Sequence, residues 1–289
     1  MAGVMAGKRG LVMGVANDHS IAWGIAKRLA DEGAEIGFTY QGDQFGRRVK
    51  PLAASVNSPF VVPCDVEDTA SVDAVFDTVR ETWGSMDFLV HAIAHSDRNE
   101  LKGRYCDTSR ENFVRTMVIS CFSFTEAAKR AAALMNDGGS IVTLTYGGAS
   151  RVMPNYNVMG VAKAALESSV RYLASDLGEQ NIRVNAISAG PVRTLAGAGV
   201  TDARLMFNYQ RKHAPLRRTV TIDEIGGTGL YLLSDMSSGV TGEIHFVDSG
   251  YNIISMPQLD ELKAEERREL VEEELEAAGR PIHPTRASG

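Results

Sequence analysis

The amino-acid sequence predicts an α/β protein in which a doubly wound parallel sheet carries helices on both faces. Short apolar runs alternate with amphipathic segments along most of its 289 residues, the pattern of strands joined by right-handed helical crossovers. Runs such as Phe88-Leu89-Val90 and Ile141-Val142 are apolar at every position, as expected of strands buried on both sides. No internal repeat or low-complexity linker interrupts the pattern, so we expect one domain over residues 1–256.

The expected elements follow one another in regular alternation. Each strand is a short apolar run, and each helix is a longer segment with apolar residues at helical spacing. Strands are expected at 10–15, 35–39, 59–63, 86–92, 140–145, 183–188 and 243–247. Helices are expected near 21–32, 44–56, 69–83, 109–136, 157–179 and 222–234.

The first strand ends in a glycine-bearing loop that starts at Gly14 and leads into a helix at Ile21. Glycine lets a backbone approach a pyrophosphate, and the N-terminus of the next helix offers free N–H groups to it. Ser20 is interpreted either as a helix cap or as a phosphate contact. Because the glycine spacing departs from G-x-G-x-x-G, the loop alone is a weak indication of a dinucleotide site.

The second and third strands end in polar residues that suit the adenosine half of a dinucleotide. At the place of Gln41, an acid binds the ribose hydroxyls of NAD and a base binds the extra phosphate of NADP. The amide of Gln41 can hydrogen-bond a ribose, which favours NADH, although Arg47 and Arg48 lie a turn or so further on. Asp65, at the end of the third strand, either accepts from the adenine amino group or forms a turn.

The fourth strand ends in His91-Ala92-Ile93-Ala94, small and apolar enough to lie under a cofactor. His91 and His95 have a spacing that suggests a metal pair. They straddle a strand end, however, and no acid of suitable geometry accompanies them, so no metal site is expected.

Tyr156 and Lys163 are the most informative pair in the chain. They stand seven residues apart in an expected helix, almost two full turns, so both side chains share one face. A phenol and an ammonium on one face suit proton delivery beside a bound nicotinamide. Tyr146, just after the fifth strand, brings a second phenol near them.

The stretch 191–220 is the irregular part of the chain, with Gly190-Pro191 at its start and glycines at 197 and 199. It is either a mobile lid over a substrate, inserted after a strand end, or an ordinary surface connection. Six basic residues and one acid lie between 193 and 218. They form either a solvated helix face or a landing patch for an acidic partner or a phosphate-bearing substrate arm.

The acidic character of the chain lies mostly in its tail. The formal net charge is −6, and residues 257–289 hold nine acids and five bases. A thin apolar stripe predicts a helix near 259–278, which either docks on another subunit or is loosely held.

Cysteine usage and hydropathy limit the cellular setting. Cys64, Cys106 and Cys121 are odd in number and widely spaced, which argues against a disulfide framework or a zinc site. No apolar run approaches the ~20 residues that span a bilayer, and no cleavable signal is evident. We therefore expect a cytoplasmic protein with neither a membrane nor a nucleic-acid partner.

These residues resemble one family, the NADH-dependent enoyl-acyl-carrier-protein reductases of bacterial fatty-acid synthesis. That family is a divergent branch of the short-chain dehydrogenase/reductase superfamily, which has a Rossmann-type sheet. The resemblance covers residues 7–256, and several long matches in the same order make it specific. The matches are 14–24, 38–41, 154–163 and 183–195.

The resemblance implies hydride transfer from NADH to the β-carbon of a trans-2-enoyl thioester carried on acyl carrier protein, by a homotetramer. Tyr156 would hydrogen-bond the developing enolate, Lys163 would hold the nicotinamide ribose, and Tyr146 would line the acyl pocket. Ser96 maps onto a substrate contact, although His95-Ser96 departs from the small and aromatic residues expected there. The implied cofactor contacts are Gly14, Ser20, Ile21, Gln41, Asp65, Val66, Ile93, Lys163, Val192, Arg193, Thr194, Leu195 and Ala196.

Two other functions stay open as alternatives. A short-chain carbonyl or sugar reductase shares the fold, but ordinary members place the lysine four residues after the tyrosine, where this chain has Gly160. A non-catalytic NAD(P)-binding regulatory protein would be expected to have lost the phenol or the ammonium, and both are present.

Overall fold

Seven parallel strands form one sheet in the order β3-β2-β1-β4-β5-β6-β7. The computed structural model describes residues 3–192, 194, 203–256, 268–269, 271 and 273–275. The strands are β1 (Arg9–Met13), β2 (Glu35–Tyr40), β3 (Val61–Pro63), β4 (Phe88–His91), β5 (Gly139–Thr145), β6 (Ile182–Ala189) and β7 (Ile244–Val247). This confirms the expected Rossmann-type architecture, with strand bounds that differ from the expected ones by a few residues.

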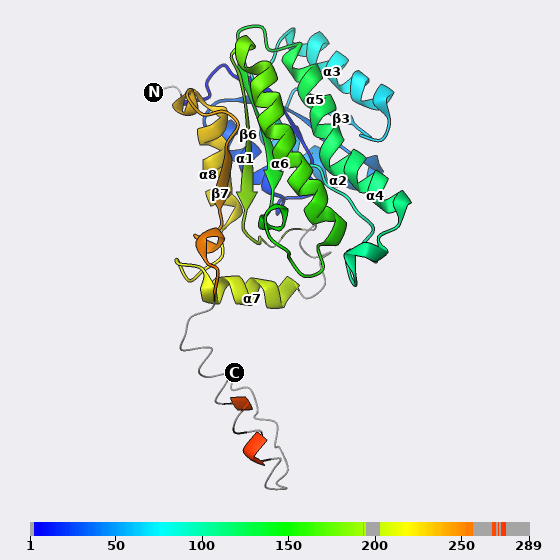
Figure 1. Ribbon diagram of the computed structural model, residues 1–289. Helices are drawn as coiled ribbons and strands as arrows, with labels where there is room; N and C mark the ends of the chain where they lie inside the picture. The colour runs from blue at the N-terminus through cyan, green and yellow to red at the C-terminus, as the bar shows by residue number, and fades with distance from the viewer. Residues whose placement is uncertain are drawn as a thin grey trace.

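Helices cover both faces of the sheet (Figure 1). The α-helices are α1 (Ile21–Asp31), α2 (Gly42–Ser55), α3 (Thr69–Trp83), α4 (Arg110–Met117), α5 (Ser123–Ala132), α6 (Asn157–Leu177), α7 (Ala203–His213) and α8 (Ile222–Leu233). A π-helical turn, η2 (Val118–Phe122), joins α4 to α5. The short 3-10 turns are η1 (Tyr105–Asp107), η3 (Gly147–Ala149), η4 (Gly178–Gln180), η6 (Asp235–Ser237) and η7 (Tyr251–Ile253).

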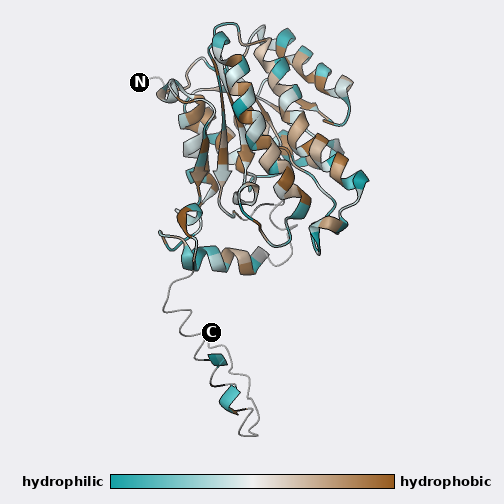
Figure 2. Cartoon of the chain, viewed as in Figure 1, coloured by the Kyte–Doolittle hydropathy of each residue, from teal (hydrophilic) through white to brown (hydrophobic). Residues whose placement is uncertain are grey.

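The strands are buried on both sides because each faces two separate apolar cores. Leu11 and Met13 of β1 join the core under α3, α5 and α6, whereas Val12 between them joins the core under α1 and α8. This alternation explains why the strands are continuously apolar. Figure 2 shows the same distribution, with hydrophobic strands inside and hydrophilic segments on the outer helix faces.

The order of the strands creates a crevice at the carboxyl ends of the central strands β1 and β4. β1 pairs with β2 on one side and with β4 on the other, so the chain runs outward to β3 and then crosses back to β4. Connections leave the carboxyl ends of β1 and β4 in opposite directions, which opens a binding crevice between them.

Two helical regions differ from the sequence-based expectation. The helix expected near 109–136 is divided into α4, η2 and α5, and the π-helical turn aims Ser120 at the loop after β4. The Ser120 hydroxyl accepts from the His95 N–H (2.9 Å) and donates to the His95 carbonyl (3.0 Å). The irregular stretch 191–220 contains α7, which lies across the end of the sheet in Figure 1.

The described residues of the tail, 268–269, 271 and 273–275, are helical. Across the described ranges, no helix is long and apolar enough to cross a membrane.

Candidate active site

A cavity of about 350 Å³ opens at the carboxyl ends of β4, β5 and β6. Its lining includes the three candidate catalytic side chains. Tyr146 directly follows β5, Tyr156 directly precedes α6, and Lys163 lies within α6. Of the predicted binding residues, Ile21, Ile93, Ser96, Val192 and Thr194 line it as well. The fold therefore brings the three candidate catalytic residues and part of the predicted binding set to one cavity.

Tyr156 precedes α6 directly, and its ring meets that of Tyr146. The ring centroids are 5.3 Å apart with an interplanar angle of 71°, an edge-to-face contact. Burial, and then the neighbouring Tyr146, raise the pKa of Tyr156 above its ordinary value. Burial also raises the pKa of Tyr146 to about 12. Both phenols are therefore protonated hydrogen-bond donors at neutral pH.

Lys163 is buried against the end of β5. Its Nζ donates to the Leu144 carbonyl at 2.7 Å, two residues before Tyr146. Burial lowers the pKa of Lys163 to about 8, with Cys121 and Glu167 acting in the opposite direction. The ammonium is thus held at a fixed point beside the phenols and still carries its charge near pH 7.

The glycine at position 160 has a packing cause. A Cβ there would lie 2.8 Å from the Gly148 carbonyl oxygen and 3.6 Å from the ring of Tyr156. Turn η3 therefore packs directly on the first turns of α6, and no larger side chain fits between them. Lys163, three residues further along, lines the cavity together with Tyr156.

The glycine loop after β1 fits a pyrophosphate. Gly14 has φ +99°, and a Cβ there would lie 2.2 Å from the Ala92 carbonyl oxygen, so the loop requires glycine. Ser20 does not cap α1; its Oγ accepts from the N–H groups of Ala16 (3.0 Å) and Asn17 (3.1 Å). The first N–H groups of α1 consequently have no side-chain cap and lie at the helix end that favours anions.

The predicted adenosine-binding residues lie at the carboxyl ends of β2 and β3, outside the wall of the cavity. Gln41 is exposed at the start of α2. Asp65 Oδ1 accepts from the Glu67 N–H at 3.0 Å, so this carboxylate does form the turn that was its alternative interpretation. The side chain of Val66 is buried in the core. Arg193, Leu195 and Ala196 lie outside the described residues.

Ser96 lies at the cavity with its hydroxyl engaged in a buried polar network. It donates to Asn112 Oδ1 at 3.3 Å and accepts from Thr116 Oγ1 at 2.9 Å. Asn112 also accepts from the Asp97 N–H at 3.0 Å. The polar side of α4 thus holds the loop after β4 in place along the cavity.

The cavity wall also contains apolar residues that the sequence analysis missed. Met206 and Phe207 come from α7, and Leu101 and Met159 line the cavity as well. The α7 pair was missed because its helix stands in a stretch that was treated as irregular. Amphipathic spacing within 203–213 is the signal that could have found it.

His91 is a core residue. Its ring nitrogens contact Ser123 Oγ (2.9 Å) and Thr143 Oγ1 (3.4 Å), and burial lowers its pKa to about 3. His95 lies outside this contact, on the cavity wall. Within the described residues, no group of three His, Cys, Asp or Glu side chains could hold a metal ion.

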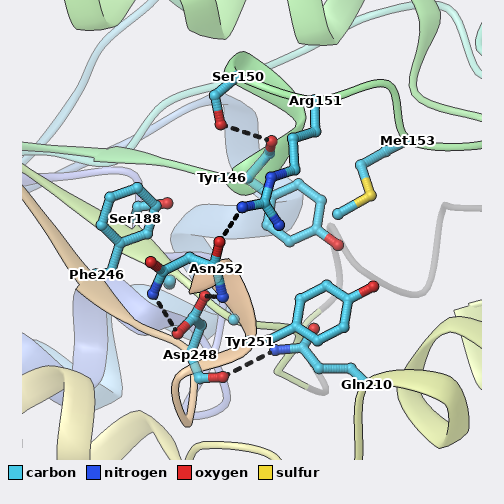
Figure 3. A pocket seen from close by; sticks show the side chains of 13 residues that line it. Tyr146, Ser150, Arg151, Met153, Ser188, Gln210, Phe246, Asp248, Tyr251 and Asn252 are labelled. Atoms are coloured by element: carbon cyan, nitrogen blue, oxygen red, sulfur yellow. Dashed lines mark hydrogen bonds between the residues drawn. The ribbon is translucent and has the colours of Figure 1, made fainter. Parts of the chain in front are cut away.

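A second cavity of about 200 Å³ lies beside Tyr146 (Figure 3). There Arg151 donates to the carbonyls of Asn252 and Ile254, the latter at 3.1 Å. Asp248 accepts from the Asn252 N–H at 2.8 Å. These contacts tie the loop before α6 to the segment after β7, so the wall of this cavity is a hydrogen-bonded unit that supports Tyr146.

The fold and the site together define a class of protein. A parallel sheet with a dinucleotide crevice, a glycine-requiring first loop, and a tyrosine just before a helix that carries a buried lysine is the arrangement of a nicotinamide-dependent reductase of the short-chain type. The family model described as enoyl-(acyl carrier protein) reductase matches residues 14–252. The chain belongs to this family.

Relatives agree over nearly the whole length. The chain is 72% identical over 263 residues to an enoyl-[acyl-carrier-protein] reductase [NADH] 2 of Rhizobium meliloti, covering 91% of this chain and 98% of the relative. It is 54% identical to the FabI reductase of Rickettsia felis, covering 89% and 99%.

Solved structures agree as well. FabI from Candidatus Liberibacter asiaticus superposes with a TM-score of 0.87 at 59% identity, over 89% of this chain and all of that one (100%). The reductase of Anaplasma phagocytophilum, solved in complex with NAD, has a TM-score of 0.86 at 56% identity, covering 89% and 98%.

Proposed function

We propose that this chain is an NADH-dependent enoyl-acyl-carrier-protein reductase that reduces the double bond of trans-2-enoyl thioesters in fatty-acid elongation. The observation that carries the proposal is the packing of Gly160 on Gly148, with Tyr156 directly before α6 and the buried Lys163 within it. A lysine four residues after the tyrosine, as in ordinary carbonyl reductases, has no room in this arrangement.

The residues present fit a nicotinamide dinucleotide. The Gly14 loop and the uncapped start of α1 suit its pyrophosphate, and Ile21, Ile93, Val192 and Thr194 would enclose its nicotinamide half. When bound, NADH supplies the hydride that reduces the β-carbon. At the far end, the amide of Gln41 suits the ribose hydroxyls, and the carboxylate of Asp65 would face the adenine.

Tyr156 would donate a hydrogen bond to the thioester carbonyl oxygen. As the β-carbon is reduced, negative charge develops on that oxygen, and a preorganised donor of this kind is typically worth ~3–4 kcal/mol in the transition state. The raised pKa of Tyr156 keeps the phenol protonated for this role. Lys163 would bind the ribose hydroxyls of the nicotinamide half and add a positive field close to the developing charge.

Tyr146 and the apolar wall would select the acyl chain. Tyr146, Met159, Met206 and Phe207 line the cavity with rings and flexible thioethers, which suit a hydrocarbon chain. Ser96, fixed by Asn112 and Thr116, would define the limit of this pocket on the side of the loop after β4.

The carrier protein would dock on α7. Arg204, Arg211 and Lys212 are exposed on this helix, and Met206 and Phe207 of the same helix line the cavity. An acidic carrier held there would have its acyl arm directed into the site, because the helix that presents the positive charges also forms the pocket wall.

We further propose that the enzyme is a homotetramer. Exposed apolar side chains gather on neighbouring elements α4, η2 and α6: Phe113 (36%), Phe122 (53%) and Val161 (37%). An exposed apolar group of this kind favours contact with a second copy. Replacement of Phe122 by Asp is expected to lower the molar mass measured by light scattering, whereas an unchanged mass would argue against this face.

We also propose residues 1–256 as the catalytic domain, 257–289 as a separate acidic tail, and the cytoplasm as the location. The sheet and cavity residues all lie before position 257, and Cys64, Cys106 and Cys121 are free thiols, as in a reducing compartment. Cell fractionation tests the location, and truncation after position 256 tests the domain boundary.

The function is tested by following the absorbance of NADH with crotonyl and longer enoyl thioesters, beside simple ketones. Turnover of the enoyl thioesters alone is the expected result. Turnover of ketones alone would indicate the carbonyl reductase, and no turnover of any enoyl thioester would refute the proposed reaction.

A further inference from the structure

Helix α6 holds the end of β5 at two successive points. Lys163 Nζ donates to the Leu144 carbonyl at 2.7 Å, and one helical turn later Glu167 Oε1 accepts from the hydroxyl of Thr145 at 2.8 Å. Leu144 and Thr145 immediately precede Tyr146. The carboxylate of Glu167 therefore fixes the same three-residue segment that anchors the ammonium and carries the second phenol.

Glu167 is also the acidic charge nearest in sequence to the buried ammonium. Residues four apart on a helix are neighbours, and Glu167 is half-buried beside Lys163. From η2, Cys121 faces the same ammonium, but burial raises the pKa of this thiol above its ordinary 9.0, so it is neutral at pH 7. From β4, the buried ring of His91 is neutral too.

The other groups that face Glu167 are cationic. Burial raises the pKa of Glu167 above its ordinary value, whereas the hydrogen bond from Thr145, Arg171 one turn further along α6, and Lys163 all favour the ionised carboxylate. An ionised Glu167 in this partly buried position is attracted to Lys163 with less solvent screening than a surface pair would have.

We propose that Glu167 is a positioning residue for the reduction, which holds the end of β5 through Thr145 and supplies the counter-charge that keeps Lys163 protonated. The inference rests on the proposed place of Lys163 at the nicotinamide. Glu167 would act on the reaction only through these two neighbours, since it does not line the cavity.

The first test is the pH profile of kcat/KM. Removal of a negative charge lowers the pKa of a neighbouring ammonium, so Glu167→Gln should move the alkaline limb of the profile toward lower pH, by on the order of half a unit or more. Asp176→Asn removes an exposed carboxylate from the same helix and should leave the limb in place. Coincident limbs for wild type and Glu167→Gln would overturn the counter-charge role.

The second test separates the hydrogen bond from the charge. Thr145→Val removes the donor and keeps the carboxylate, so kcat should fall several-fold while the alkaline limb stays in place. Thr145→Ser keeps the hydroxyl and should restore kcat. An unchanged kcat in Thr145→Val would overturn the positioning role, because the end of β5 would then need no hold from Glu167.

A third measurement needs neither turnover nor a folded Glu167 variant. The ¹³Cε resonance of Lys163 in cofactor-free wild type, assigned by its absence in Lys163→Arg, should show a main titration step near its pKa of about 8. A second, smaller step should appear at acid pH as Glu167 is protonated. Absence of the acid step would overturn the coupling even if the proposed reaction is correct, and its presence would support the coupling even if that reaction is not.

Discussion

Replacement of Gly160 by alanine tests the packing that distinguishes this site from that of ordinary carbonyl reductases. The added Cβ would lie 2.8 Å from the Gly148 carbonyl oxygen, a backbone atom that yields only if η3 moves relative to α6. Overpacking of this kind costs about 1–3 kcal/mol, and alanine in a helix regains about 0.5–1 kcal/mol over glycine. The expected net loss is therefore up to about 2.5 kcal/mol of unfolding free energy, with a midrange of roughly 1 kcal/mol.

The matched control is Gly227→Ala. Gly227 is exposed within α8, and a Cβ there meets no atom within 4 Å, so only the helix gain of about 0.5–1 kcal/mol applies. The midpoint of thermal unfolding should therefore be a few degrees lower than that of wild type in Gly160→Ala, and higher than that of wild type in Gly227→Ala. Because relief of the 2.8 Å contact requires η3, which directly follows Tyr146, to move, kcat of Gly160→Ala should fall as well. Equal stabilisation of both variants, with full activity, would refute the reasoning.

Three further predictions concern the site residues. Tyr156→Phe should lower kcat about 10²–10³-fold with little change in the dissociation constant of NADH measured by fluorescence titration, because the lost hydrogen bond belongs to the transition state. The pKa of Lys163 is about 8 in the folded protein against an ordinary 10.5, so the unfolded chain binds more protons between these values. The contribution of Lys163 to stability should therefore rise from pH 8 to pH 10.5 while activity falls, as measured by denaturant unfolding of wild type against Lys163→Met. Charge reversal of Arg204 and Lys212 should raise KM for carrier-linked substrates more than for short thioesters in steady-state assays.

Each of these predictions has a control. Tyr172→Phe alters an exposed phenol of α6 and should keep full activity, whereas full activity in Tyr156→Phe would remove the proposed donor. Parallel stability curves for wild type and Lys163→Met between pH 8 and pH 10.5 would contradict the lowered pKa. Lys129→Glu reverses an exposed charge on α5, a helix that contributes no residue to the cavity lining, and should affect neither KM. Equal effects of the α7 reversals on both substrates would rule out the carrier patch.

The layered fold could be predicted from the sequence because its strands are buried on both faces. Runs such as 88–90 are apolar at every position, a signal that tertiary context does not alter. Helix α7 gives a weaker signal, because it follows a glycine- and proline-bearing stretch and is rich in polar residues. The π-helical turn η2 gives none, since what distinguishes it is a tertiary contact between Ser120 and the backbone of His95, far apart in the sequence.

The sequence was sufficient to choose the candidate catalytic residues, but it did not predict the hydrogen-bond partners of the side chains around them. The spacing of Tyr156 and Lys163 placed both on one face of a helix, and the structure brings both to one cavity. The partners of Ser20 and Asp65 were left as alternatives, because a short polar side chain binds whichever N–H the local turn presents. Residues such as Glu167 were not recognised, since a glutamate on a helix is ordinarily solvated and only its contact with Thr145 distinguishes it.

Burial shifts the pKa values of the two central groups of the site, Tyr156 and Lys163, in opposite directions, and this difference bears on the reaction. Burial raises the pKa of Tyr156 and lowers that of Lys163 to about 8. An ammonium in direct contact with a phenol would instead lower the pKa of the phenol, as a proton-abstracting tyrosine requires. Here the ammonium of Lys163 donates a hydrogen bond to the Leu144 carbonyl, and the phenol of Tyr156 keeps its proton. Such a phenol is suited to donate a hydrogen bond to an oxygen that becomes negative, which is what reduction of an enoyl thioester demands, and it is poorly suited to accept a proton from an alcohol.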